Sequence, residues 1–535
     1  APGVAAYGAA ISACGKGRQW ALALECLRQM GSRCLAPNAI CLGAAIGACS
    51  RAAQASAALA LLRDAEAQGS EVGVVGWSAA LSACGRAHEW WQALQLLGGM
   101  AARSTTPDAV CYSAAIGACG HGNHWQVGLQ LLGEMKLSSI RLDLVVYNTT
   151  MSVCEKSHEW GRALGLLSEM RTLALVPDLV SCNAAIAACS RGGLWADAAW
   201  MLQAAARDSL KPDVVSFAAA ISACERARQW APALRSLEAM RVRGLRPNAV
   251  CYGAAIGACE WPLGLALLRS MRPRGPAPTA VCFNAAISAC ERAGRWREGL
   301  ELLAEMQLAA VQPSVVSFNA SISACEKGSE WQRALQLLGT MRGSGLQPSV
   351  VSFGAALSAC RQGWQWQHTL VALAAMEREG LAPDAECRRV ALAALFLAGR
   401  LPEALGLLRG AATEGQALCE VQAEAPGELL LDLHGLPVEV AQIAVCAALE
   451  DAARGAAAAD GGRLTLVVGR GLHSDDGEAL LRPALLAMLV EDLRLEAHFA
   501  PRNPGRLLVP IGSLRTSWGM QPRPGITGGL RGRAA

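Results

Sequence analysis

A period of 35 residues runs through most of this sequence and constrains its fold more than any other feature. Most periods contain one cysteine and one tryptophan at fixed places. Such a period is typical of solenoids, in which a unit cannot bury its apolar face alone and stacks on its neighbours instead. The residues that mark the period are Cys14, Cys49, Cys84, Cys119, Cys154, Cys189, Cys224, Cys259, Cys290, Cys325 and Cys360, and Trp20, Trp90, Trp125, Trp160, Trp195, Trp230, Trp296, Trp331 and Trp366.

Each unit has the pattern of two helices joined by a short break. In the unit that starts at Val214, two apolar residues lead into an alanine-rich run, residues 225–228 interrupt it, and Trp230 starts a second apolar-periodic run. A Gly-Leu-x-Pro-Asp turn such as 380–384 closes the unit. Proline stops a helix there, and aspartate suits the turn that leads to the next one. Each unit is therefore predicted to be a helical hairpin.

Stacked hairpins of this kind predict the architecture of most of the chain. We count eleven units in residues 1–384; the second lacks the closing proline and the eighth is four residues short. A degenerate twelfth unit, residues 385–415, is expected to cap the array. The predicted fold is an α-helical solenoid of tandem helix-turn-helix repeats in a right-handed superhelix, followed by a small two-layer α/β domain.

Of the 21 cysteines, those that recur with the period are predicted to be buried, reduced thiols. Equivalent residues of stacked helices lie roughly 10 Å apart, whereas a disulfide needs Cα atoms within about 7 Å. Small buried thiols in a reducing compartment explain the spacing better. The sequence contains no Cys-x-x-Cys pair, and Cys111 and Cys119 are two helical turns apart, so we predict no metal site among these cysteines.

Charge and hydropathy limit the classes of partner that the chain is expected to bind. The net charge is +4, and residues 512–535 hold four arginines and no acid, so the remainder is neutral overall. This tail is expected to be disordered and basic. We find no uninterrupted apolar stretch of 18 residues, so no membrane partner is predicted. The chain begins inside a unit without a methionine, so we expect a fragment or a processed form.

The units resemble the pentatricopeptide repeat family. Val315-Val316-Ser317-Phe318-Asn319 and the closing Gly345-Leu346-Gln347-Pro348-Ser349 match the consensus of that family, as does the period of 35 residues. Tetratricopeptide repeats, with 34 residues, mostly bind peptides and are the alternative. The resemblance implies that single-stranded RNA is the partner. It also implies that the fifth and last residues of a unit read one base and that the second residue packs against the face of that base.

Six units carry a complete pair of polar residues at the fifth and last positions. A carboxylate there only accepts hydrogen bonds, whereas asparagine both donates and accepts them. Second-position residues such as Val145, Val180, Val215 and Val316 form a row that sandwiches bases, with ordinary helix-start packing as the alternative. The implied footprint is x-x-G-G-U-U-x-x-C-C-x, because five units have glycine or alanine at the fifth position. Carried over by position, Ser78 with Asp108 and Ser113 with Asp143 imply G, Asn148 with Asp178 and Asn183 with Asp213 imply U, and Asn284 with Ser314 and Asn319 with Ser349 imply C.

The sequence pattern changes after the repeats. Residues 416–428 are predicted to be a linker, and residues 429–511 a compact α/β domain. Apolar runs predict strands at 429–433, 464–468, 496–500 and 506–511, and helices at 437–454 and 478–493. Strand, helix and strand at this spacing imply a parallel pair with a right-handed crossover. Ligands of such sheets bind beyond the carboxyl ends of the strands.

Polar residues follow the first two of these strands. Asp432 and His434 end the first strand, and a glycine-containing loop, Gly469-Arg470-Gly471-Leu472-His473-Ser474, follows the second. The backbone N–H groups of Gly469 and Gly471 and the helix that follows favour a phosphate there. This segment resembles the Smr (small MutS-related) domain. The resemblance implies a nicking nuclease in which Asp432, His434, Arg470 and His473 are catalytic.

The alternative to this nuclease is a domain that only binds. No cofactor is certain; Asp475 and Asp476 either repel RNA or recruit Mg²⁺ for the Smr-like domain, and no other metal or small-molecule cofactor is predicted. The two resemblances together imply a sequence-selective RNA-binding protein of organellar RNA processing, in a chloroplast or mitochondrion, with endoribonuclease activity. A non-catalytic factor that stabilises or translates a transcript, or a protein-binding helical scaffold, remains the alternative.

Overall fold

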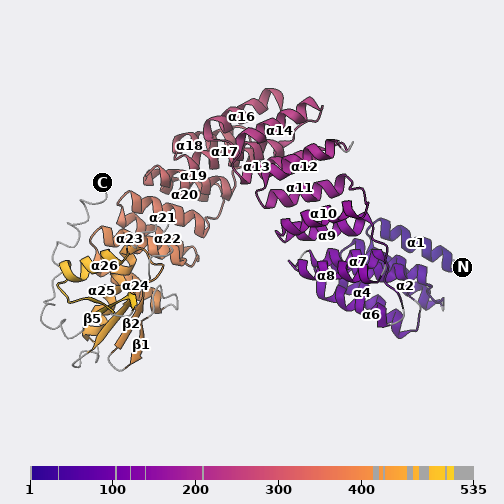
Figure 1. The fold of residues 1–535 in the computed structure, drawn as a ribbon, viewed down its shortest axis with the longest axis horizontal. Helices are drawn as coiled ribbons and strands as arrows, with labels where there is room; N and C mark the ends of the chain where they lie inside the picture. The colour runs from indigo at the N-terminus through magenta and orange to yellow at the C-terminus, as the bar shows by residue number, and fades with distance from the viewer. Residues whose placement is uncertain are drawn as a thin grey trace. The chain divides into compact units, whose positions relative to one another are not determined.

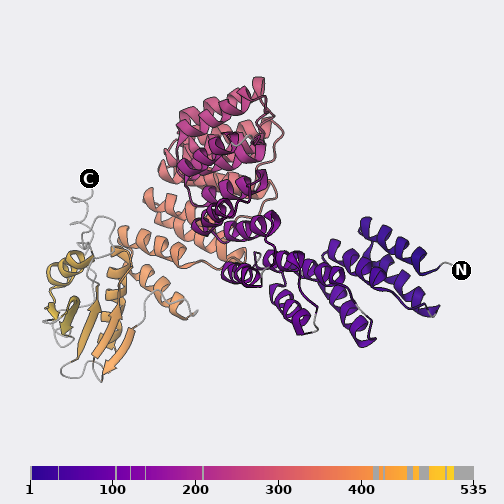
Figure 2. The same cartoon turned by 45° about the vertical axis from the view of Figure 1, so that its right-hand side comes forward.

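The first part of the chain is a succession of helical hairpins in the computed structural model (Figures 1 and 2). The structure describes residues 3–413, except 34, 71, 103–104, 121, 139 and 208–209, and then 421–425, 428–454, 462–468, 481–500 and 503–510. Helices α1–α24 pair consecutively, so that an odd-numbered helix opens each unit and an even-numbered helix closes it. The predicted hairpins are confirmed, and residues 385–415, predicted as a degenerate unit, contain the pair α23 and α24.

The opening helices are α1 (Val4–Lys16), α3 (Ala39–Arg51), α5 (Val74–Arg86), α7 (Ala109–Cys119), α9 (Leu144–Lys156), α11 (Leu179–Arg191), α13 (Val214–Arg226), α15 (Ala249–Ala258), α17 (Ala280–Arg292), α19 (Val315–Lys327), α21 (Val350–Gln362) and α23 (Ala385–Leu397). The closing helices are α2 (Trp20–Ser32), α4 (Ala55–Ala67), α6 (Trp90–Ala102), α8 (Trp125–Leu137), α10 (Trp160–Thr172), α12 (Trp195–Arg207), α14 (Trp230–Val242), α16 (Trp261–Arg274), α18 (Trp296–Leu308), α20 (Trp331–Gly343), α22 (Trp366–Arg378) and α24 (Leu401–Thr413).

The boundaries of these helices have local causes. The last residue of a unit, such as Asp213, caps the next opening helix because its side chain accepts the N–H of Ser216, which has no partner inside the helix. The opening helix ends in a tight turn, in which Arg228 adopts a left-handed backbone (φ 53°) and the N–H of Gln229 returns to the carbonyl of Cys224. The closing helix then starts at Trp230.

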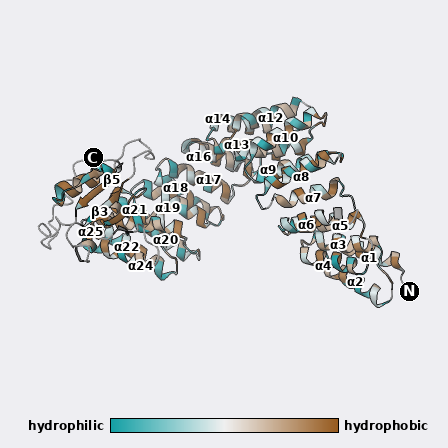
Figure 3. Cartoon of the chain, turned by 60° about the horizontal axis from the view of Figure 1, so that its bottom comes forward, coloured by the Kyte–Doolittle hydropathy of each residue, from teal (hydrophilic) through white to brown (hydrophobic). Residues whose placement is uncertain are grey.

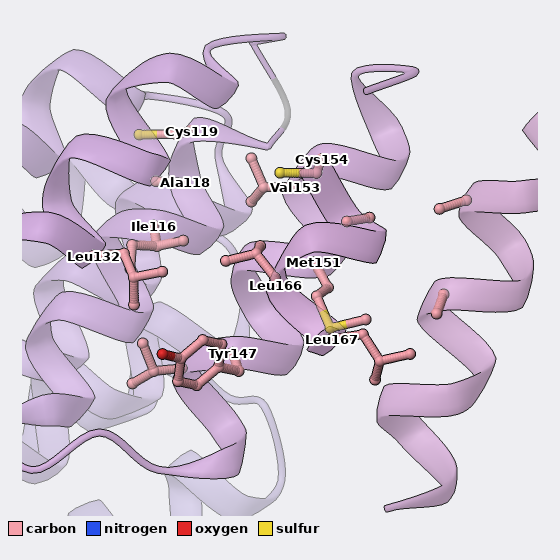
Figure 4. Close-up of a cluster of buried hydrophobic side chains, with 14 of the residues drawn as sticks. Ile116, Ala118, Cys119, Leu132, Tyr147, Met151, Val153, Cys154, Leu166 and Leu167 are labelled. Atoms are coloured by element: carbon pink, nitrogen blue, oxygen red, sulfur yellow. The ribbon is translucent and has the colours of Figure 1, made fainter. Parts of the chain in front are cut away.

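The core of the repeats is made of small and medium side chains from both helices of each unit. Around α7–α10, Ile116, Tyr147 and Met151 are completely buried, and Leu166 and Leu167 of α10 pack beside them (Figure 4). Most opening helices lie against the next opening helix, as α11 lies against α13. All described cysteines are free, and all except Cys14 and Cys26 are buried, as predicted.

Two compact units divide the chain, residues 1–285 and 286–535. Within the second, a five-stranded sheet has the order β1-β2-β3-β5-β4. Figure 3 shows hydrophobic colouring on β3. Strand β2 runs parallel to β3, while the other neighbours are antiparallel. Its elements are β1 (Val421–Ala425), β2 (Glu428–Asp432), α25 (Val438–Arg454), β3 (Arg463–Val467), α26 (Leu481–Ala487), the π-helical turn η2 (Met488–Asp492), β4 (His498–Ala500) and β5 (Asn503–Pro510).

Two features of this region differ from the prediction. Residues 416–428 were expected to be a linker, but β1 lies within them and pairs with β2, because the open edge of β2 offers unpaired backbone groups. Second, the apolar side chains of α23 and α24, among them Leu392 and Leu405, belong to the same cluster as Leu431 of the sheet. Arg409 of α24 also binds Glu450 of α25 (3.0 Å). The last hairpin and the sheet thus share one core.

Candidate nucleic-acid interface

A row of exposed aliphatic side chains marks the start of the opening helices. The second residue of each unit, counted from the first residue of its opening helix, is 54–75% exposed in ten successive units. Ordinary helix-start packing would bury these side chains, and burial is what an aliphatic residue normally gains from folding. A regular row of exposed side chains offers contact surface to a ligand. The row consists of Ile40, Val75, Val110, Val145, Val180, Val215, Val250, Val281, Val316 and Val351.

In three units the fifth residue, an asparagine, donates a hydrogen bond to the last residue of the same unit. Asn148 lies on α9, and Asp178, thirty residues later, caps α11; the Asn148 Nδ2 atom donates to Asp178 Oδ1 at 3.2 Å. The two residues meet because α9 and α11 pack side by side. Asn183 donates in the same way to Asp213 (3.4 Å), and Asn319 to Ser349 (3.5 Å).

A serine completes each of these three pairs. Ser181, on α11, donates from Oγ to Asn148 Oδ1 at 2.6 Å, and its backbone N–H donates to Asp178 Oδ1 at 2.8 Å. Partial burial alone would raise the pKa of Asp178, but hydrogen bonds from Ser181 and Asn148 together lower it. Asp178 is therefore ionised at neutral pH. In the described structure its hydrogen bonds use Oδ1, which leaves Oδ2 as an acceptor for a ligand.

The serine–aspartate pairs have a different arrangement. Ser78 donates to the carbonyl oxygen of Val75 in its own helix (3.0 Å), and Ser113 bonds Thr149 of the next unit (3.2 Å). Their predicted partners Asp108 and Asp143 cap α7 and α9 through Oδ1. These hydrogen bonds do not join the predicted serine and aspartate of a unit.

The remaining predicted pair consists of Asn284, which lies on α17, and Ser314, which caps α19.

A groove of about 650 Å³ lies beside the first of these positions. Its lining includes second-position Ile40 and Val75, fifth-position Gly43 and Ser78, and Arg86 from the end of α5. The exposed row, the fifth positions and a cation therefore face one space. This cation and its equivalents were not predicted from the sequence.

Basic residues recur in the last turn of the opening helices. Several of them are held by the preceding unit: Arg86 donates to Ser50 Oγ (2.8 Å), and Arg191 pairs with Glu155 (3.2 Å). The net charge of the chain does not reveal this row, because acidic residues cancel the charge of the cations. The recurrence of one cation at a fixed place in the period could have indicated it. Its members are Lys16, Arg51, Arg86, Lys156, Arg191, Arg226, Arg292, Lys327 and Arg361.

The sheet places Asp432 and His434 together, at the carboxyl end of β2. The ring Nδ1 of His434 lies 2.6 Å from Asp432 Oδ1, and its backbone N–H donates to the same oxygen at 3.1 Å. Burial opposes ionisation of Asp432, but these hydrogen bonds outweigh it and lower the pKa of the carboxyl. An ionised carboxylate only accepts, so the hydrogen bond requires a proton on Nδ1 of His434. The imidazole is 72% exposed.

Several predicted residues fall outside the described part of the chain: Gly469, Arg470, Gly471, His473, Asp475 and Asp476, together with the tail 512–535. Among the described residues, no three His, Cys, Asp or Glu side chains are grouped closely enough to hold a metal ion. None of the helices in the described ranges combines the length and apolar character needed to cross a bilayer.

Comparison with solved structures finds the maize pentatricopeptide repeat protein PPR10, with 18% identity, a TM-score of 0.41, and 78% of this chain and 75% of PPR10 covered. PPR10 in complex with an 18-nt psaJ RNA element is similar at 20% identity, with a TM-score of 0.36 and coverage of 78% and 76%. A search of curated proteins finds no match.

Family models match the helical repeats along most of their length. The pentatricopeptide repeat domain model matches residues 60–122, 130–191 and 201–260. The PPR repeat model matches 5–35, 110–140 and 316–346, and the PPR repeat family model matches 278–327. Together these segments span more than half of the chain. The chain therefore belongs to the pentatricopeptide repeat family.

Proposed function

We propose that this chain is a sequence-selective single-stranded RNA-binding protein of organellar RNA processing, in a chloroplast or mitochondrion. The observation that carries the proposal is the hydrogen-bonded pair of fifth and last residues, such as Asn148 and Asp178, beside the exposed second-position row. Bases have two chemically different surfaces, a flat apolar face and a polar edge. Exposed valines suit the face, and the polar pair suits the edge.

The pairs differ in what they offer a base. Asp178 Oδ2 is an acceptor, which suits the N3–H of uracil, and the same holds for Asp213. Ser349 replaces this carboxylate with a hydroxyl, which is able to donate to N3 of cytosine. The basic row in the last turn of the opening helices supplies cations for phosphates, one from each of nine units. Base selectivity and backbone attraction thus have separate sources.

A direct binding measurement tests this proposal. One RNA carries GG, UU, two unspecified bases and CC in the order of the units, synthesised in both polarities; the control RNA has UU and CC exchanged. Selective binding gives a lower Kd for one polarity of the first RNA, and each mismatched base is expected to cost about 1–3 kcal/mol. Equal Kd values for footprint and control RNA refute the base assignment. Binding of peptides without any binding of RNA would instead support the alternative, a protein-binding scaffold of the tetratricopeptide type.

A second candidate function belongs to the sheet. The Asp432–His434 pair resembles a general base in its arrangement, with an exposed imidazole whose Nδ1 is held by a carboxylate. We propose that this edge, together with Arg470 and His473, which follow β3 in the sequence, forms an Smr-type phosphodiester site that cuts the RNA held by the repeats. Arg470 would neutralise the phosphate, and Mg²⁺ is the cofactor to test.

Cleavage of the footprint RNA by wild type, His434→Ala and His498→Ala distinguishes the outcomes. His498 is an exposed histidine on β4 of the same sheet and is the matched control. The proposal predicts that only His434→Ala abolishes cleavage while leaving Kd for the RNA unchanged. Cleavage that survives this substitution refutes the assigned site, and selective binding without any cleavage identifies a non-catalytic RNA-binding factor.

A further inference from the structure

One position outside the base-reading pair varies together with it. Asparagine occupies the fifth position in four units, and the third residue of the following unit is then always serine. In the seven units with glycine, serine or alanine at the fifth position, that third residue is never serine. The matched residues are Asn148 with Ser181, Asn183 with Ser216, Asn284 with Ser317 and Asn319 with Ser352; elsewhere the third residues are Cys41, Gly76, Cys111, Val146, Cys251, Cys282 and Cys387.

The structure gives this covariation a physical cause. Ser181, Ser216 and Ser352 are almost completely buried, and each places its Oγ 2.5–2.6 Å from the side-chain oxygen of the preceding asparagine. Ser181 Oγ also lies 2.8 Å from Asp178 Oδ1. The one proton of the hydroxyl has both oxygens within reach, and the shorter distance favours Asn148 Oδ1. A buried hydroxyl needs such a partner.

This hydrogen bond and the carboxylate of Asp178 together fix which way the asparagine amide faces. An amide turned by 180° would present Nδ2 to the serine and Oδ1 to the carboxylate of Asp178, where two acceptors would meet. With the serine donating to Oδ1, Nδ2 faces Asp178 instead, at 3.2 Å. The amide and the carboxylate therefore hold one arrangement before any base arrives.

We propose that the third-position serine of the following unit is a positioning residue for base recognition, which fixes the amide of the fifth-position asparagine. This inference rests on the proposed RNA-binding function and extends it to a residue that touches the asparagine rather than the base. In units without the asparagine, the residue that follows in place of serine makes other contacts. The eighth unit has Gly253 at its fifth position, and Cys282, the third residue of the next unit, donates from Sγ to the carbonyl oxygen of Ala249 at 3.3 Å.

Four variants test the role at the fifth unit. Ser181→Ala removes the donor, Ser181→Cys keeps a side chain that the fold accepts at this place in other units but donates weakly, and Ser181→Thr keeps the hydroxyl. Cys251→Ala is the matched control, because the preceding unit has Ala218 at its fifth position. The readout is the ratio of Kd values for RNAs with C and U opposite the fifth unit. A general loss of folded protein changes both Kd values equally and leaves this ratio unchanged.

The expected results follow from the loss of one hydrogen bond. Ser181→Ala and Ser181→Cys lower the preference for U about fivefold, whereas Ser181→Thr and Cys251→Ala retain it. If wild type prefers U and Ser181→Ala retains the full preference, the positioning role is refuted while RNA reading stands. If wild type itself shows no preference at the fifth and sixth units, base reading fails, and with it the role proposed for the serine.

A gain of function provides an independent check. The eleventh unit has Gly354 at its fifth position and Asp384 at its last, and a Cβ at Gly354 would meet Cys387 Sγ at 3.7 Å, an ordinary contact. Gly354→Asn alone gives an asparagine without its serine; Gly354→Asn with Cys387→Ser supplies both. The double variant should prefer U at the eleventh unit about fivefold more strongly than the single variant. Equal preferences in the two variants overturn the proposal.

Discussion

Asp178→Ser should convert the fifth unit from a preference for U to a preference for C. The chain already contains the expected product, because Asn319, Ser349 and Ser352 form the same cluster with serine as the last residue. Ser352 directs its proton to Asn319 Oδ1 at 2.5 Å. Ser349 then donates to Ser352 Oγ (3.1 Å) in the free protein, and on RNA binding this proton would turn to N3 of cytosine.

The magnitude follows from what the substitution keeps and what it removes. It keeps the cap of α11, since serine and aspartate are about equally good caps, so the free energy of unfolding should change by less than about 0.5 kcal/mol. It removes Oδ2, the acceptor assigned to the N3–H of uracil. Losing a matched base edge costs about 1–3 kcal/mol, or about 5- to 150-fold in Kd.

The assay is binding to two RNAs that differ only in the base opposite the fifth unit. Wild type should bind the U-containing RNA more tightly and Asp178→Ser the C-containing RNA. Asp178→Asn keeps a cap but offers no carboxylate, and it serves as the control for loss of charge. An unchanged preference in Asp178→Ser, with the melting temperature preserved, would refute the assignment of Asp178 to a base edge.

Three further perturbations have outcomes set by burial and charge. Ile116→Ala leaves a cavity in a completely buried place, so α7 should lose about 2–5 kcal/mol of protection in native-state hydrogen exchange. Partly exposed Cys14 and Cys26 should be alkylated before the other described cysteines, which are buried away from the reagent. Burial also raises the pKa of Cys111 to about 12, and peptide mass mapping of the labelled protein checks the order. Burial opposes ionisation of Asp213, but hydrogen bonds from Ser216 and Asn183 outweigh it and lower the pKa of Asp213 below its ordinary 3.8. Ionised Asp213 therefore stabilises the fold at neutral pH. This stabilisation is lost as the pH falls through the lowered pKa. The preference for U at the sixth unit should therefore be constant between about pH 8 and about pH 5 in binding titrations.

The helices of the repeats were predictable because each boundary has a cause within a few residues. Asp213 caps α13 through Ser216, and Trp230 starts α14 where the sequence pattern placed it. The exposed second-position row was also visible as a period, although its exposure was not. A valine such as Val215 has the same local pattern whether it is buried against a neighbour or faces solvent. Only the packing of α13 on its neighbours decides between the two.

Features that depend on contacts between distant residues were not predictable in this way. The serine that bridges Asn148 and Asp178 lies 33 residues after the asparagine, and its role is visible only where α9 meets α11. Strand β1 was missed because its sequence, Val-Gln-Ala-Glu-Ala, contains several residues that favour strands poorly; pairing with β2 forms it. The π-helical turn of residues 488–492 in the predicted helix 478–493 has no local signal that we recognise.

Selection from a randomised RNA pool tests the central claim most directly. The account predicts enriched sequences that contain, in the order of the units, a G doublet, a U doublet, two unconstrained bases and a C doublet. Selection with the Ser181→Ala variant should relax the first U while leaving the C doublet enriched. Enriched sequences without these doublets, or a pool that the protein does not enrich at all, would contradict the claim that the paired side chains of the repeats read bases.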